Sequence, residues 1–182
     1  MVIKIKKDKE LEMDNSGIIT TLLGGMLAIV GGFCATLFAQ YMSEIIERKK
    51  IKRNKAQELY VMITETENNF ISSLYVMHAY IDKGMNLEKA IEVGVNGTNN
   101  IYSSANKISS ISNIYIEELS EEAETYADMV KKSYIGVLDK ILKKESVENI
   151  YLEMTDAFTS ITLPGKELKL SVKKIINNKQ GG

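Results

Sequence analysis

The chain has 182 residues, a formal net charge of −1, one cysteine, one proline and no tryptophan. This length suffices for one domain with a core of its own, and the near-neutral charge gives no general attraction to nucleic acid. A single cysteine, Cys34, excludes an internal disulfide and fits a reducing compartment. Because no Cys/His cluster has the spacing of a metal site, we expect no metal and no other cofactor.

The longest uncharged segment lies between Asp14 and Glu44. Roughly 20 apolar residues in a helix cross a bilayer core about 30 Å thick. The pattern therefore predicts a transmembrane helix at residues 17–43, preceded by a short N-terminal tail at 1–16. The apolar run is too long for a signal peptide and no A-x-A sequence follows it, which favours an uncleaved signal-anchor. The alternative is a buried helix of a soluble protein.

Basic residues flank this segment on both sides. Six follow it, namely Arg48, Lys49, Lys50, Lys52, Arg53 and Lys55. Four lysines precede it, at positions 4, 6, 7 and 9. The larger number on the C-terminal side predicts a single-pass protein of the inner (plasma) membrane whose C-terminal domain is cytoplasmic. Control of topology and contact with phospholipid explain such a stretch. Since it lacks the interleaved aromatic residues of a stacking surface, we expect no nucleic-acid partner.

Small and polar residues recur at every fourth position inside the apolar segment. They are Thr20, Gly24, Ala28, Gly32, Thr36 and Gln40, with Gly31, Ala35 and Ala39 in a second row beside them. Small residues allow membrane helices to approach closely, so the pattern predicts a contact face and a homo-oligomer. In a ring of subunits the polar members would line a narrow pore, whereas in a dimer they would form hydrogen bonds across the contact. The sequence leaves both arrangements open.

Apolar residues at helical spacing continue through the rest of the chain. The predicted helical stretches are residues 56–81, 87–93, 101–111, 119–141 and 147–161. Matching apolar stripes pack as a bundle, so the predicted fold class is all-α, with a single N-terminal transmembrane helix that continues into a cytoplasmic helical bundle at 44–163.

Local signals predict where these helices begin and end. Gly84 is expected to end the first helix, and Asn86, Ser120 and Ser146 are expected to cap later ones. Residues 96–100 are turn-like, and the serine-rich segment 109–113 is a possible break. A basic C-terminal tail is predicted at 164–182, after Pro164. Its alternation suits a strand at first, but its apolar residues also suit a helix. It would either contact anionic lipid or form a solvated terminus.

Residues that could carry chemistry are few. His78 is the only histidine and has apolar neighbours, so we interpret it as a packed bundle residue. The acidic run at 117–128 fits a solvated helix face. Glu67 interrupts an apolar stripe, which indicates either a polar contact between subunits or a partly exposed edge. Without a phosphate loop or a nucleophile–base pair, we expect no catalytic, cofactor-binding or metal residues and no enzyme activity.

The layout of anchor at 17–42, basic stretch at 47–55 and helical remainder resembles small bacterial membrane accessory proteins of antiviral systems. It is similar in plan to the membrane accessory protein of type VI-B CRISPR loci, which implies a helical domain that assembles into a pore-like ring. Position 73 is serine, so the Arg–His signature of helical HEPN RNA-cutting domains is missing, and no functional residue is carried over. We therefore expect a pore-forming or membrane-perturbing effector. The alternative is an anchored helical adaptor that binds a cytoplasmic protein.

Overall fold

The computed structural model describes the backbone of residues 2–82 and 87–177 and the side chains of residues 17–79, 81 and 88–177. The helices are α1 (Val2–Asp82), α2 (Leu87–Tyr115), the short 3-10 helix η1 (Glu117–Leu119), α3 (Ser120–Leu142) and α4 (Val147–Asn177). No strand occurs within these described ranges, which confirms the all-helical fold. Contacts divide the chain into two units, Met1–Lys49 and Lys50–Gly182.

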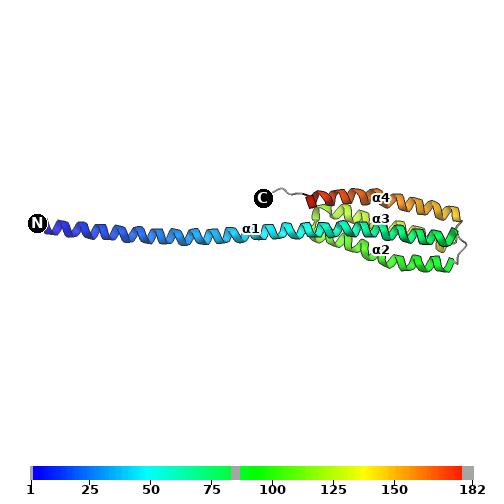
Figure 1. Cartoon of the computed structure of the whole chain (residues 1–182), viewed down its shortest axis with the longest axis horizontal. Helices are drawn as coiled ribbons and strands as arrows, with labels where there is room; N and C mark the ends of the chain where they lie inside the picture. Colours follow the sequence, from blue (N-terminus) through cyan, green and yellow to red (C-terminus); the bar gives the residue numbers. More distant parts are fainter. Residues whose placement is uncertain (1, 83–86, 178–182) are drawn as a thin grey trace. The chain divides into compact units, whose positions relative to one another are not determined.

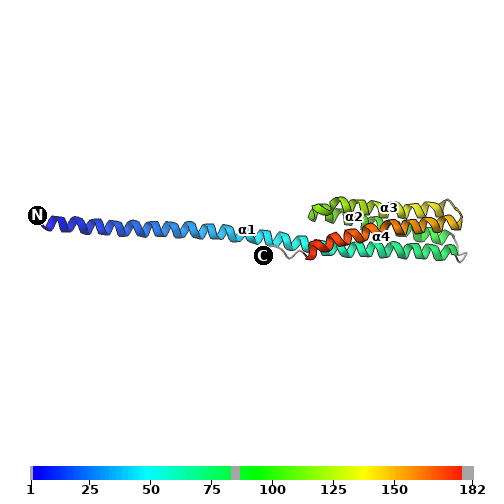
Figure 2. The same ribbon diagram turned by 90° about the horizontal axis from the view of Figure 1, so that it is seen from above.

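The second unit is a four-helix bundle made of the C-terminal part of α1 with α2, α3 and α4. Figures 1 and 2 show that each of these helices runs antiparallel to the one before it. The links from α2 to α3 and from α3 to α4 are short, and short connections favour antiparallel neighbours. Lys144, in the second of these links, adopts the left-handed conformation with φ 53°.

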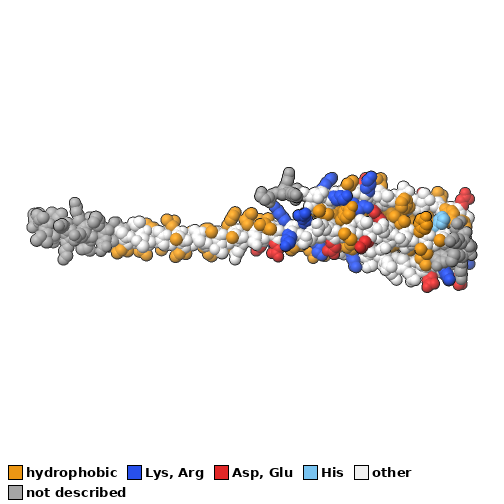
Figure 3. Space-filling model, in the orientation of Figure 1, with side chains coloured by type: hydrophobic (Ala, Val, Ile, Leu, Met, Phe, Trp, Pro, Cys, Tyr) orange, Lys and Arg blue, Asp and Glu red, His pale blue; other side chains and the backbone are white. Residues whose placement is uncertain are grey.

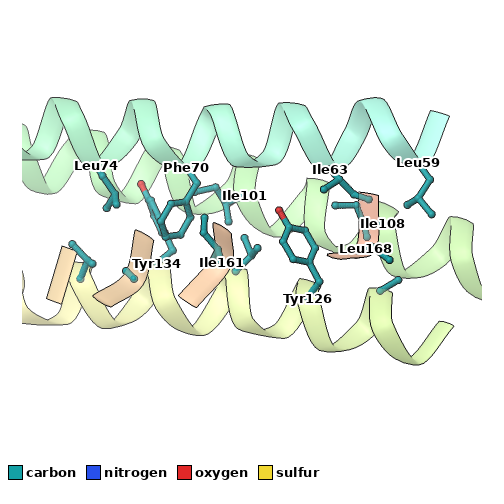
Figure 4. Packing of buried hydrophobic residues seen from close by; sticks show 14 of the residues in the cluster. Leu59, Ile63, Phe70, Leu74, Ile101, Ile108, Tyr126, Tyr134, Ile161 and Leu168 are labelled. Carbon is teal, nitrogen blue, oxygen red and sulfur yellow. The ribbon is translucent and has the colours of Figure 1, made fainter. Parts of the chain in front are cut away.

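The core of the bundle is built from one apolar stripe on each helix (Figure 4). Its largest fully buried side chains include Leu59, Ile63 and Phe70 of α1, Ile101 and Ile108 of α2, Tyr126 and Tyr134 of α3, and Ile161 and Leu168 of α4. The rings of Phe70 and Tyr134 meet edge to face, with centroids 5.6 Å apart. The predicted stripes therefore do face one common core.

Two predicted interruptions of α2 are wrong. Residues 96–100 were expected to turn and 109–113 to break the helix, but α2 is continuous from Leu87 to Tyr115. The hydroxyls of Ser109, Ser110 and Ser112 donate hydrogen bonds to carbonyl oxygens four residues earlier, at 2.8–3.4 Å. Their hydrogen-bonding groups are therefore satisfied inside the helix, and the serines do not break it. Gly97 serves packing instead of a turn, because a Cβ there would lie 2.1 Å from Oη of Tyr134.

Of the predicted helix caps, the one at Ser146 is confirmed and the one at Ser120 is wrong. Ser146 does cap α4, since its hydroxyl accepts a hydrogen bond from the Asn149 N–H at 3.3 Å. Ser120 is not a cap, because Leu119 holds the N-cap position of α3 without a side-chain bond. The 3-10 turn η1 leads directly into α3 and supplies a backbone carbonyl to the N–H of Ser120. Gly84 and Asn86 lie outside the described residues.

The boundary expected at Pro164 is absent from the structure, because α4 continues through this proline to Asn177. A proline inside a helix costs about 3 kcal/mol. Leu168 and Val172, both beyond the proline, are buried in the core. Burial of each such side chain contributes roughly 1.5–3 kcal/mol. The described part of the predicted basic tail at 164–182 is therefore the last part of a bundle helix. At the other end α1 already begins at Val2, so the predicted tail at 1–16 is helical from that residue.

Candidate functional site

One helix near the N-terminus is long and apolar enough to cross a membrane. Within α1, an 18-residue window reaches a mean hydropathy of 2.1, and none of it is buried inside the chain. Figure 3 shows hydrophobic side chains along this segment without blue or red charged atoms between them. A Cβ added at Gly24, Gly25, Gly31 or Gly32 would meet nothing within 4 Å. Nothing among the described residues of the chain therefore covers this apolar surface.

The helical geometry separates the six residues of the predicted contact row. Each residue turns an α-helix by about 100°, so five steps of four residues turn the row by roughly 200°. Gly24, Ala28 and Gly32 stay within roughly 80° of one another and share a face. Thr36 and Gln40 rotate away to the side that carries Met26, Ile29 and Phe33. The hydroxyl of Thr36 donates to the Gly32 carbonyl at 2.9 Å.

A straight row of small residues shares Gly24 and Ala28 with the predicted row. It alternates steps of four and three residues and consists of Gly17, Thr21, Gly24, Ala28, Gly31 and Ala35. We call this row the small-residue face. Its average step is about 3.6 residues, the period of the α-helix, so the row stays on one face of α1 and can face one partner helix. The hydroxyl of Thr21 donates to the Gly17 carbonyl at 2.9 Å, so this polar group is satisfied within α1.

Two of the six predicted basic residues, Lys52 and Lys55, form ion pairs within the bundle unit. Nζ of Lys52 lies 2.6 Å from Oε1 of Glu118 in η1. Burial opposes ionisation of Glu118, but the hydrogen bond and positive charge of Lys52 outweigh it and lower the pKa of this carboxyl. Lys55 bonds to Glu58 at 2.7 Å and lies over the Tyr115 ring. The side chains of Arg48, Lys49, Lys50 and Arg53 are exposed.

Glu67, which interrupts an apolar stripe in the sequence, belongs to a polar cluster where α1, α3 and α4 meet, and its partner is in the same chain and not in another subunit. Oε2 of Glu67 accepts a hydrogen bond from Nζ of Lys169 at 2.5 Å, and both side chains are about four-fifths buried. Gly165 gives this carboxylate room, because a Cβ there would lie 2.1 Å from Oε1 of Glu67 and 2.9 Å from Cε2 of Tyr126. Glu67 therefore forms its ion pair with Lys169 of the same chain, at the contact between α1 and α4.

The two buried tyrosines of α3 differ in how their hydroxyls are satisfied. Both rings extend into the core on the side of α1 (Figure 4). The Tyr134 hydroxyl donates to the Gly94 carbonyl at 3.1 Å. The Tyr126 hydroxyl is buried without a hydrogen-bond partner, as is Oε1 of Glu67. Burial raises the pKa of Tyr134, and burial together with the negative charge of Glu67 raises that of Tyr126.

We expect opposite effects from removing these two hydroxyls. Tyr126→Phe should stabilise the bundle by about 1–2 kcal/mol because it removes an unsatisfied buried group, whereas Tyr134→Phe should destabilise it by about 1 kcal/mol.

Both tyrosines stay protonated in the folded state above about pH 10, where unfolded tyrosine ionises, so stability should fall as the pH rises beyond that value. Tyr126→Phe should weaken this fall. Urea unfolding of the full chain in detergent, followed by circular dichroism at neutral and alkaline pH, measures both effects. A loss of stability in Tyr126→Phe would contradict the assignment.

His78 is not packed in the core as expected but is exposed on α1. Its ring stacks on that of Tyr151 of α4, with centroids 4.5 Å apart and an interplanar angle of 17°. Among the described residues, no three histidine, cysteine or acidic side chains gather in a way that could hold a metal ion. The sequence did contain a signal for an uncharged surface around His78, because residues 68–81 include no charged residue.

Comparison with known proteins adds no family assignment. No protein family, no curated protein and no solved structure matches this chain.

Proposed function

We propose that this is a single-pass membrane protein that self-associates through the small-residue face of α1 and acts as a pore-forming or membrane-perturbing effector. The observation that carries the proposal is the uncovered apolar segment of α1, which bears a straight row of small residues. In lipid, helices gain no hydrophobic energy by pairing, so close approach at small residues supplies the attraction.

The basic residues that follow the span support a cytoplasmic bundle in this proposal. α1 extends from Val2 to Asp82, so one helix supplies both the apolar segment and the first helix of the bundle. A role in antiviral defence stays a prediction that comes only from the resemblance of the layout.

The test is the mass of the full chain in detergent for the native protein and for Gly24→Leu/Gly31→Leu. We expect a discrete native oligomer that dissociates to monomer in the double variant, because leucine on the small-residue face separates the backbones. Thr36→Leu/Gln40→Leu is the matched control, since it changes two residues that have rotated off this face, and it should keep the oligomer. A monomeric native protein would overturn self-association.

Leakage of dye from liposomes then tests the membrane activity. The native chain and the control variant should release dye, and the Gly24→Leu/Gly31→Leu variant should not. An oligomer that releases no dye would overturn the pore-forming role. The adaptor alternative predicts that a polyleucine helix can replace residues 17–43 without loss of function, which the effector proposal forbids.

A further inference from the structure

Helix α4 has a weak point well inside its length. Pro164 has no N–H to donate to the carbonyl of Ser160, and proline is the most costly residue in a helix interior. Gly165 follows it, and glycine is the next poorest helix former. α4 continues beyond this pair to Asn177, toward its red end in Figure 1. We call residues 166–177 the strap.

The weak point lies against the polar cluster in the core. A Cβ on Gly165 would clash with Oε1 of Glu67 and with Cε2 of Tyr126. Oε1 and the Tyr126 hydroxyl are both buried without a hydrogen-bond partner. Burial of a polar group without a partner costs free energy, and contact with water removes that cost. Movement of α4 away from α1 at Gly165 would therefore be favoured by hydration of both groups.

Few side chains hold the strap on the bundle. Leu168 and Val172 are buried, and two isoleucines that follow them are partly buried. Lys169 forms its ion pair mostly out of water, where the loss of hydration offsets much of the attraction between the charges. Nζ of Lys173 lies 5.2 Å from the centre of the Tyr60 ring, and such a contact contributes little at an exposed site.

The rest of the bundle has core residues of its own. Figure 4 shows Leu168 of the strap at the same level as Ile63 of α1 and Ile108 of α2, which remain to pack on each other. Proteins open locally in cooperative units, and the parts with few buried apolar contacts open most easily. The part of α4 before the proline keeps a separate set of buried side chains, namely Ile150, Met154, Ala157 and Ile161.

From these observations we infer that the strap opens as one unit about Pro164 and Gly165 while the rest of the bundle stays folded. The closed form is the main one, and the ion pair between Glu67 and Lys169 holds it closed. Opening brings water to the carboxylate of Glu67 and the hydroxyl of Tyr126. Because every contact in this inference lies within one chain, it does not depend on self-association.

Hydrogen–deuterium exchange of the full chain in detergent, read at single residues, tests this opening. The amides of residues 168–176 should share one level of protection, at least roughly tenfold lower than that of residues 150–161 in the same helix, with the step at the proline. Protection that falls gradually toward Asn177 would indicate simple fraying of a helix end and would overturn the inference. Equal protection on both sides of Pro164 would overturn it as well.

Pro164→Ala should slow exchange in the strap at least roughly tenfold, because alanine supplies the missing N–H and is the best helix former. Thr159→Ala is the matched control, since it raises helix propensity at an exposed position of α4 before the weak point. It should leave exchange in the strap unchanged. If Pro164→Ala also left it unchanged, the strap would not open about this residue.

Lys169→Met tests the ion pair as the contact that holds the strap closed. Exchange in the strap should become at least roughly tenfold faster, because the carboxylate of Glu67 then favours contact with water over burial without its cation. Unchanged exchange in this variant would contradict the role given to the pair. The mass of the chain in detergent, monomer or oligomer, bears on the proposed function and leaves this inference unaffected.

Discussion

Lys169→Met is expected to destabilise the bundle by about 3 kcal/mol, because it leaves the carboxylate of Glu67 largely buried without its cation. One oxygen of this carboxylate, Oε1, already lacks a hydrogen-bond partner in the native protein. Loss of Lys169 would leave the second oxygen without its donor as well. Urea unfolding of the full chain in detergent, followed by circular dichroism, measures the change in the free energy of unfolding.

Two further variants decide whether the effect comes from the buried pair. Glu67→Met/Lys169→Met should restore most of the lost stability, since replacing a whole buried ion pair by apolar side chains is often neutral or stabilising. Lys52→Met is the matched control, because it removes a lysine from an exposed pair with Glu118. It should cost less than about 1 kcal/mol. Equal losses in Lys169→Met and Lys52→Met would contradict the structural assignment.

Gly97→Ala is expected to destabilise the bundle by about 2 kcal/mol, although alanine is the better helix former. The added Cβ would lie 2.1 Å from Oη and 3.0 Å from Cζ of Tyr134, and that ring is fixed in the core. Overpacking costs about 1–3 kcal/mol, and so close a contact with a fixed ring falls at the upper end of this range. The gain of about 1 kcal/mol in helix propensity then leaves a net loss of about 2 kcal/mol. The same unfolding experiment measures the net change.

Gly136→Ala provides the control for this prediction. Its Cβ would meet only the carboxylate of Glu153, at 2.7 Å, which is the end of a flexible side chain. The variant should therefore be neutral or stabilised by up to about 1 kcal/mol. Gly97→Ala/Tyr134→Phe should recover part of the loss, because the closest atom is gone. If Gly97→Ala stabilised the chain, the close contact between α2 and α3 would be refuted.

The sequence by itself determined the helical class, the apolar segment and the stripes of the core. These are periodic features, and a period of 3.6 residues can be read without knowing which helices meet. The stripe containing Ile63 and Phe70 on α1 was predicted for this reason, as was the one containing Tyr126 and Tyr134 on α3. The cap at Ser146 was also predictable, because it depends only on neighbouring residues.

Tertiary structure decided the features that depend on residues far apart in the chain. Glycine at 97 suggests a turn by its local preference, yet the ring of Tyr134 makes it a packing residue inside a helix. Pro164 suggests a helix end, yet burial of Leu168 and Val172 keeps α4 intact beyond it. Glu67 is interpretable only with Lys169, 102 residues later. Each of these outcomes was set by a contact whose partner lies in another helix, because local preferences of about 1–3 kcal/mol are smaller than the packing energy of a shared core.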